Sequence, residues 1–305
     1  MVGIAASLLV SVLLLTPLAD KENLQKLLSS IGPSFLLMLT YVPKLGYLLV
    51  FWLLVRRLPK GEWQKETMSF LDLAKIFLMT YGISTVINTI GAAISKTAPS
   101  GGTQELDMVG SLVGTGLLMG FLIPSVIGPI VEELIFRKLT IDRLRPYGER
   151  TAIVFSALCF GLFHGNLTQF LYAASVGLFF GYVYSNTGKV LLTMIMHILL
   201  NSLSSSIILL LPLLQNKPED GNILPYAVAI LIILVIAFML VSGFVLLIRR
   251  IRKKDVRLDG SMPDAIPKSE VFKTVYLNPG VIVFFVYEIG SIVMDLLNIL
   301  LPVLN

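Results

Sequence analysis

The sequence predicts an all-α fold, a polytopic bundle of about 8–9 transmembrane helices. Three observations support this class. Of the 305 residues, 55% are hydrophobic and only 14% are charged, whereas soluble domains carry roughly 25% charged residues. Apolar runs of roughly 18 residues or more, enough to cross a bilayer, recur along the chain. Lysines and arginines gather in alternate connections between these runs. Since lipid offers the backbone no hydrogen-bond partners, the spans are expected to be helical.

The expected spans follow the apolar runs in order. They lie at residues 2–19, 29–55, 76–95, 109–145, 150–166, 169–185, 188–213, 223–248 and 279–303. The first residues lack the basic start and small-residue cleavage site of a signal peptide, so we expect 2–19 to remain as an anchor span. We divide the chain into three regions: N-terminal spans (1–108), a central helical core (109–213), and C-terminal spans (214–305) with a basic cytoplasmic loop near 249–274.

The segment 109–145 is too long for one plain crossing. Pro124 and the Gly128-Pro129 pair interrupt it, so we expect a break there and a second helix that starts near Pro129. Glu132 and Glu133 would then fall in the first turn of that helix, where the helix dipole favours carboxylates.

Two pairs of glycines are spaced for close helix packing. They are Gly116-x-x-x-Gly120 and Gly177-x-x-x-Gly181, and small residues four apart let neighbouring helices approach closely.

The distribution of basic residues predicts the topology. With the N-terminus inside, the cytoplasmic loops hold most of the 24 lysines and arginines, and the outer loops hold only Lys21, Lys26, Lys96 and Lys217. The positive-inside rule therefore predicts a multi-pass protein of the cell membrane with a cytoplasmic N-terminus. The net charge of +5 is explained by this topology, so the lipid bilayer is the expected partner and nucleic acid is not. Cys159 is expected to be a small buried side chain rather than a nucleophile.

Several charged residues fall inside an expected span. Such residues cost about 2.5–3.5 kcal/mol each on insertion scales and usually face a cavity or a partner. Glu133 and Arg137 are four residues apart and can pair on one helix face, while Glu132, about 100° round the helix, faces a different neighbour. Taken alone, this pattern also fits a buried ion pair that only stabilises packing.

The depth of the two histidines points to a shared site. The turn at Pro146 and Gly148 closes a cytoplasmic hairpin, with Glu133 roughly 20 Å before it and His164 roughly 22–24 Å after it along antiparallel helices. His197 follows Gly188 by roughly 14 Å of helix, and Asn201 lies one turn deeper on the same face. We therefore expect these side chains to meet at one level of the membrane.

The three motifs are Glu132-Glu133-x-x-x-Arg137, Phe160-x-x-x-His164 and His197-x-x-x-Asn201. In this order, on successive helical regions, they resemble the signature motifs of the CPBP family, the type 2 CAAX prenyl proteases and bacteriocin-processing (Abi) membrane peptidases. The resemblance covers about residues 109–205. It implies that 109–213 is a CPBP-type catalytic core. It further implies an endopeptidase of the bacterial cytoplasmic membrane, which cleaves peptide bonds from a cavity open to the cytoplasm.

The resemblance also implies roles for the motif residues. Glu132 would act as the general base on the attacking water, and His164 would share that water. His197 and Asn201 would stabilise the oxyanion by donating hydrogen bonds. No serine or cysteine within the motifs is placed as a nucleophile, which favours attack by water over an acyl-enzyme. The expected substrate is a membrane-associated peptide or lipidated protein, such as a prenylated CAAX tail or a bacteriocin or other peptide precursor.

Glu133 and Arg137 would support the geometry of the first motif. Metal dependence stays open at this point, because Glu132, His164 and His197 would suit zinc with an open fourth position. The H-E-x-x-H helix of typical zinc peptidases is absent from the sequence. A glutamate-activated water without a cofactor is favoured over zinc.

Two other classes of function remain. An ion-coupled transporter is one, because intramembrane glutamate and histidine often relay protons. Lys44 and the pair Glu288 and Asp295, seven residues apart in the last span, give it some support, although no inverted repeat is visible. A scaffold or bacteriocin self-immunity protein without catalysis is the other. The intact set of costly buried charges argues against the scaffold.

Overall fold

The computed structural model describes residues 33–61, 67–96, 121–215, 223–253 and 267–304. The regular structure within these ranges is helical throughout, which confirms the predicted all-α class. The predicted anchor span at 2–19, the first part of 109–145 and the Gly116-x-x-x-Gly120 pair lie outside the described residues.

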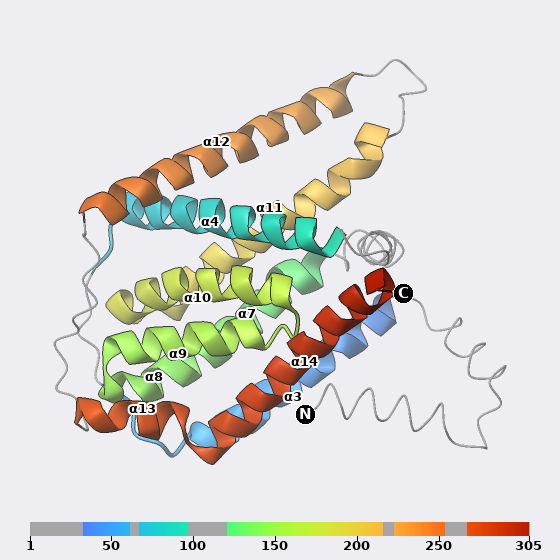
Figure 1. Cartoon of the computed structure of the whole chain (residues 1–305). Coiled ribbons are helices and arrows are strands. Elements are labelled where there is room, and N and C mark those ends of the chain that lie inside the picture. Colours follow the sequence, from blue (N-terminus) through green and yellow to red (C-terminus); the bar gives the residue numbers. More distant parts are fainter. Residues whose placement is uncertain (1–32, 62–66, 97–120, 216–222, 254–266, 305) are drawn as a thin grey trace, which may run out of the picture.

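The helices are labelled as in Figure 1. In chain order they are α3 (Pro33–Val55), α4 (Phe70–Lys96), η1 (Ile123–Ile127), α7 (Gly128–Glu133), η2 (Leu134–Ile141), α8 (Asp142–Leu144), η3 (Arg145–Tyr147), α9 (Glu149–Leu162), α10 (Leu167–Thr187), α11 (Val190–Gln215), α12 (Leu224–Lys253), α13 (Lys268–Tyr276) and α14 (Pro279–Leu304). Two of these segments, η1 and η2, are π-helices, and η3 is a turn of 3-10 helix.

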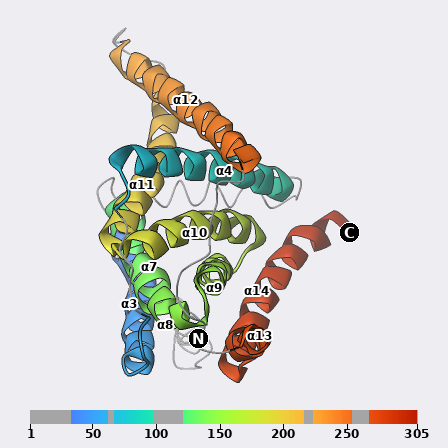
Figure 2. The ribbon, with the colours of Figure 1, turned by 90° about the vertical axis from the view of Figure 1, so that its left-hand side faces the viewer.

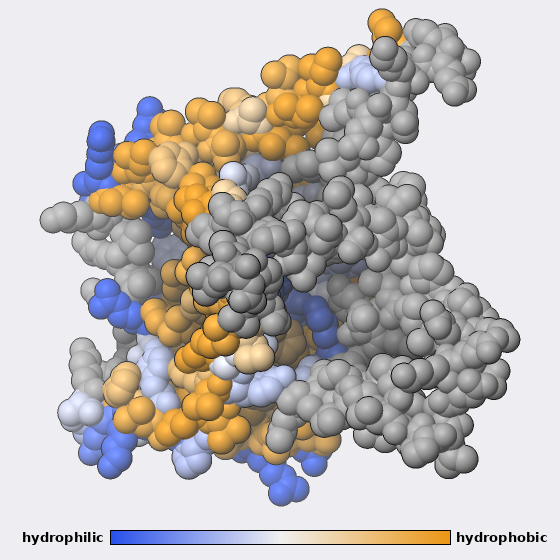
Figure 3. Space-filling view, turned by 45° about the vertical axis from the view of Figure 1, so that its right-hand side comes forward, coloured by the Kyte–Doolittle hydropathy of each residue, from blue (hydrophilic) through white to orange (hydrophobic). Residues whose placement is uncertain are grey.

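Within the described residues, 4 helical stretches are long and apolar enough to cross a membrane: Phe70–Gly91, Leu167–Thr187, Tyr226–Lys253 and Pro279–Leu297. Shorter apolar helices cover Lys44–Val55 and Val190–Ser205. Figure 3 shows hydrophobic side chains along α12 and over much of the coloured part of the visible face, with hydrophilic ones at the left and lower margins and a few toward the centre. These stretches are candidate membrane spans, and the total of about 8–9 stays a prediction.

The predicted span at 150–166 differs from the structure. Its helix, α9, ends at Leu162 and has 14 residues, fewer than the roughly 20 that a straight crossing needs. The chain turns at Gly165, whose φ of 70° lies in the left-handed region, and Asn166 then caps α10 by accepting a hydrogen bond from the Gln169 backbone N–H at 2.9 Å.

The centre of the molecule is formed by α9 and α10, which lie side by side in Figures 1 and 2, with α4 packed against α10 and α12 against α4. The predicted role of Gly177 and Gly181 is confirmed. A Cβ atom at Gly177 would lie 2.8 Å from the Cα atom of Ala157, and one at Gly181 would lie 3.1 Å from the Ile153 side chain. The glycines let α10 approach α9 closely.

The remaining helices lie on two sides of this centre. Figure 2 shows α3, α7, α8 and α11 gathered on one side, and α13 and α14 on the other. The predicted loop near 249–274 is largely helical where it is described, since α12 continues to Lys253 and α13 begins at Lys268. Burial explains the second helix: Val275 is buried and the Tyr276 ring packs on Phe155 at 5.4 Å.

The predicted break at Pro124 and Gly128-Pro129 is wrong. The chain is helical without interruption from residue 121 to residue 147. The first turns widen into the π-helix η1, in which the Gly128 N–H donates to the Ile123 carbonyl five residues earlier. As a result Glu132 and Glu133 lie at the end of α7, in the middle of a continuous helix rather than in a first turn.

A hydrogen bond from another helix explains how the chain passes both prolines. In the π register the Pro124 carbonyl would accept from residue 129, but proline has no N–H. The Asn201 side chain of α11 donates to this carbonyl instead, at 3.0 Å. The backbone polar group therefore keeps a partner, and the helix needs no break.

Candidate active site

The elements that carry the three motifs pack together. The first motif lies on α7 and η2, His164 lies in the turn after α9, and His197 and Asn201 lie on α11. α11 packs against η1 and α7, and α9 packs against η2. The tertiary structure therefore brings the motifs to one region, as the depth argument predicts.

Glu133 is bonded on both sides. Its Oε1 atom lies 3.0 Å from His197 Nδ1, and its Oε2 atom lies 3.1 Å from Arg137 Nε. The side chains of Glu133 and Arg137 are 0% exposed. The predicted pairing along one helix face is thus confirmed, and His197 joins it from α11. The charge of this buried carboxylate, which would otherwise be costly in an apolar interior, is compensated by the guanidinium on one side, while the imidazole contacts it on the other.

Glu132 faces a different neighbour, also as predicted. Its Oε1 atom accepts a hydrogen bond from Lys44 Nζ at 2.8 Å, and its Oε2 atom lies 3.9 Å from His197 Nε2. Lys44 comes from α3, so the carboxylate is held between α3 and α11. Two glutamates with a lysine and an arginine form a cluster whose formal charges balance.

The ring of Phe160 lies at the centre of the cluster. It makes edge-to-face contacts with His164 at 5.2 Å and with His197 at 5.7 Å between ring centroids. The Arg137 guanidinium lies 4.9 Å from the same centroid. One aromatic side chain therefore fixes the orientation of two imidazoles and a cation, which gives the phenylalanine of the second motif a physical role.

His164 is oriented by the end of α9. Its Nδ1 atom lies 2.9 Å from the Phe160 carbonyl, and because a carbonyl only accepts, Nδ1 is the donor. In the neutral imidazole, Nε2 is then the atom with a lone pair. Nε2 is thus the ring atom that is able to take a proton from water.

Asn201 is placed differently from the expectation. Its amide group donates to the Pro124 carbonyl at 3.0 Å, so one of its two N–H donors serves the backbone of η1. The residue therefore ties α11 to the helix that carries both glutamates, which is a structural role beside the one that the resemblance implies.

The would-be zinc ligands do not form a metal site as they stand. Across the described ranges, no three His, Cys, Asp or Glu side chains are grouped to hold a metal ion. The Lys44 ammonium already occupies Oε1 of Glu132, where a metal would bring a second positive charge.

Two contacts of the site were missed by the sequence analysis. Lys44 was assigned no partner, although a lone cation in the apolar stretch Pro33–Val55 requires an anion. Nothing in the sequence marks Ser156 as a site residue. In the structure its hydroxyl accepts a hydrogen bond from Arg137 Nη1 at 3.4 Å and donates one to the Phe136 carbonyl at 2.6 Å. It lies in α9, so this pair links α9 to η2.

These features define a class, a helical membrane protein with a buried Glu-Glu-Arg-His cluster. Comparison with known proteins points to a family. Residues 114–203 match the family model described as type II CAAX prenyl endopeptidase Rce1-like, so this region of the chain is similar to that family. All six predicted site residues lie within the matched range.

A curated relative supports the same family. The chain is 31% identical over 85 residues to the protein of Bacillus subtilis (strain 168) named "Putative membrane peptidase YdiL". The alignment covers 27% of this chain and 34% of the relative, so the chain matches about a third of that protein's length. No solved structure matches the chain significantly.

Proposed function

We propose that this protein is a membrane endopeptidase that hydrolyses a peptide bond by a glutamate-activated water. The observation that carries the proposal is the convergence of Glu132, Glu133, Arg137 and His197 on one buried cluster beside the Phe160 ring. Similarity to the family over residues 114–203 supports it. A packing role alone gives no reason for a second, separately paired glutamate next to the first.

In the proposed mechanism Glu132 is the general base. It takes a proton from a water that His164 also binds through Nε2, and the resulting hydroxide attacks the carbonyl carbon of the scissile bond. His197 and Asn201 donate to the oxyanion through His197 Nε2 and an amide N–H. The proton then passes from Glu132 to the leaving amine, so that the base is regenerated as the peptide bond breaks.

Glu133 and Arg137 act through their neighbours. Glu133 accepts from His197 Nδ1 at 3.0 Å, which turns Nε2 toward Glu132, and Arg137 holds the other oxygen of Glu133 at 3.1 Å. They are positioning residues in this proposal, because the contacts described for them reach other protein groups. Removal of either is expected to move His197 rather than to delete a reacting atom.

We further propose that the substrate is a membrane-associated peptide or a lipidated protein, such as a prenylated CAAX tail or a bacteriocin or other peptide precursor. The apolar helices around the cluster and the family description support this class. The reaction is proposed to take place at the cytoplasmic side, where the positive-inside distribution places the turn around Gly148.

The first experiment is cleavage of quenched fluorescent peptides, prenylated ones included, by the purified protein in detergent. Glu132→Ala and His164→Ala are each expected to lower kcat about 10²–10⁴-fold, the usual contribution of a general base or acid. Glu288→Gln is the matched control, because Glu288 is also a buried carboxylate but lies on α14, and it is expected to retain activity.

A strong chelator is added in a parallel series. Retained activity supports attack by water without a metal, and loss of activity that zinc restores supports the alternative site of Glu132, His164 and His197. The peptidase proposal would be refuted if wild type and both alanine variants cleaved the peptides equally, or if a folded wild type cleaved none of them. Either result would favour a scaffold protein or an ion-coupled carrier.

A further inference from the structure

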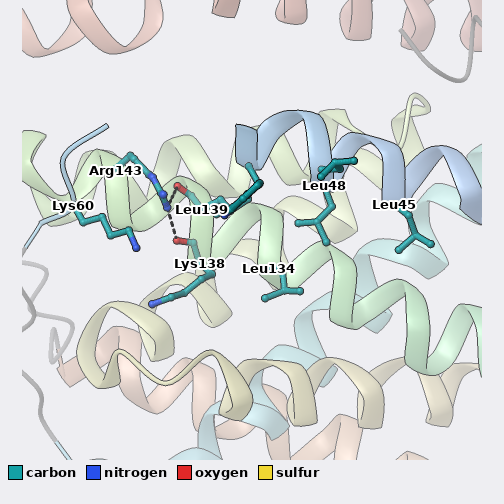
Figure 4. A pocket seen from close by; sticks show the side chains of 9 residues that line it. Leu45, Leu48, Lys60, Leu134, Lys138, Leu139 and Arg143 are labelled. Atoms are coloured by element: carbon teal, nitrogen blue, oxygen red, sulfur yellow. Dashed lines mark hydrogen bonds between the residues drawn. The ribbon is translucent and has the colours of Figure 1, made fainter. Parts of the chain in front are cut away.

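A groove outside the motif cluster lies between α3 and η2 (Figure 4), with a volume of about 450 Å³. Apolar side chains form most of its wall: Leu45, Leu48, Leu49, Trp52, Leu134 and Leu139. All three charged residues that line it are cations, namely Lys60, Lys138 and Arg143. The groove therefore combines a hydrophobic wall with a positive charge that no lining carboxylate offsets.

The two kinds of lining residue are separated along the groove. Figure 4 shows Lys60, Lys138 and Arg143 at one end, and Leu48 and Leu45 toward the other. A ligand that matches this separation of cationic and apolar residues is amphipathic, with an anionic group at one end and an apolar chain that runs along α3.

The cationic end is built by fixed contacts. Arg143 Nε donates to the Val55 carbonyl at 3.2 Å and Nη1 donates to the Leu139 carbonyl at 3.3 Å, so the guanidinium sits at the C-terminal end of α3. The Gly61 N–H donates to the Asp142 carbonyl at 2.8 Å, which holds the segment of Lys60 against α8. The cations are therefore gathered before any ligand binds.

Their charge is only partly compensated. Lys138 Nζ pairs with Asp142 Oδ2 at 3.1 Å, whereas Arg143 bonds to carbonyls, which are neutral. Lys60 is exposed at the mouth. A net positive charge thus remains for an anion to neutralise.

The groove is aligned with the expected membrane boundary. The apolar part of α3 ends at Val55, and Arg56 lies over the Trp52 ring at 5.2 Å, an arrangement typical of the membrane–water interface. With this expected boundary, the cations would lie at the level of the lipid headgroups and the leucines at the level of the acyl chains. The positive-inside distribution assigns this end to the cytoplasmic leaflet.

We propose that this groove binds an anionic phospholipid of the cytoplasmic leaflet, with the phosphate at Lys60, Lys138 and Arg143 and an acyl chain along Leu45, Leu48 and Leu49. Charge complementarity selects an anionic headgroup, and the apolar wall selects a ligand with a long chain. Two lining residues, Leu45 and Leu134, directly follow Lys44 and Glu133 in the chain, so the groove lies on the helical segments that also carry these two cluster residues. The proposal does not depend on peptidase activity.

The test is native mass spectrometry of the full chain in non-ionic detergent, titrated with phosphatidylglycerol or phosphatidylcholine of the same chain length. Phosphatidylglycerol is expected to bind more tightly. Lys60→Gln is expected to weaken the binding of phosphatidylglycerol about fivefold. Lys189→Gln is the matched control, since Lys189 is also an exposed lysine but does not line the groove, and this variant is expected to bind phosphatidylglycerol as wild type does. Leu49→Trp places a larger side chain in the groove and is expected to weaken the binding of both lipids.

Each other result overturns the proposal. Equal binding of the two lipids, or equal effects of Lys60→Gln and Lys189→Gln, would mean an unselective apolar groove. If the Leu49→Trp variant bound phosphatidylglycerol as wild type does, and glycerophosphate competed with the lipid, the groove would be a phosphate site that does not bind an acyl chain. Displacement of phosphatidylglycerol by an equal concentration of a prenylated peptide would assign the groove to the substrate. Melting temperatures of the variants separate these outcomes from unfolding.

Discussion

Single side chains determine the character of the cluster. Glu133 is fully buried between Arg137 and His197, and Glu132 lies between Lys44 and His197. The two adjacent glutamates are therefore distinguished by their partners: one is bonded on both sides by groups of the helical core, and the other is held by a lysine that is 28% exposed. Glu132 is the more accessible of the two, which suits the role of a base.

Lys44 and Glu132 are expected to be energetically coupled. Lys44→Met leaves the Glu132 carboxylate without its cation and should lower the free energy of unfolding, and Glu132→Gln should relieve that loss. Thermal unfolding of the two single variants and the double variant is expected to give a coupling energy of about 0.5–3 kcal/mol. Lys75→Met is the control, since Lys75 pairs with exposed Asp72. Additive effects of the two substitutions would rule out the coupling.

At the scale of elements, the continuous helix from η1 to η3 is the least regular part of the site. It contains π turns on both sides of the glutamates, and such turns occur frequently at functional sites. It also passes Pro124 and Pro129 without a break, because Asn201 of α11 replaces the missing backbone donor.

A double substitution tests this replacement. Asn201→Ala leaves the Pro124 carbonyl without its donor and is expected to cost about 1–3 kcal/mol of stability. In the background of Pro129→Ala the cost should be smaller, because the introduced alanine would supply a backbone N–H in the π register. The measurement is thermal or denaturant unfolding in detergent. An equal cost in both backgrounds would show that the Asn201 bond does not substitute for the backbone donor.

At the scale of the whole molecule, the cations and the apolar helices are arranged together. The C-terminal end of α10 meets α8 and η3, since Tyr184 donates to Asp142 at 2.7 Å and Arg145 donates to the Ser185 carbonyl at 2.8 Å. Lys60, Lys138, Arg143 and Lys189 therefore belong to one end of the molecule. The structure thus groups loops that the positive-inside rule assigns to the cytoplasm.

Cysteine labelling tests that assignment. Cys159 is buried, and Cys159→Ala provides a background free of thiols. Lys189→Cys and Lys273→Cys are expected to react with an impermeant maleimide only after the membrane is permeabilised, whereas Lys217→Cys is expected to react in intact cells. The opposite pattern would invert the predicted topology, and uniform reactivity would contradict a membrane-spanning arrangement.

The sequence alone determined the features that depend on local order. Hydropathy over windows of one helix length gave the all-α membrane class, and a spacing of four residues predicted the pair of Glu133 and Arg137. Resemblance over about a hundred residues also indicated the family. The same local reasoning failed at Pro124 and Pro129, because proline's effect on a helix was judged without the neighbour that compensates for it.

Only the tertiary structure decided which side chains meet across helices. Lys44 and Glu132 are separated by 88 positions, and Asn201 and Pro124 by 77, so no helical periodicity relates either pair. Lys60 and Arg143 likewise meet at the groove only because Arg143 caps the end of α3. The physical reason is that side-chain period and hydropathy report which face of a helix is apolar, whereas the identity of the facing helix follows from how all the helices pack.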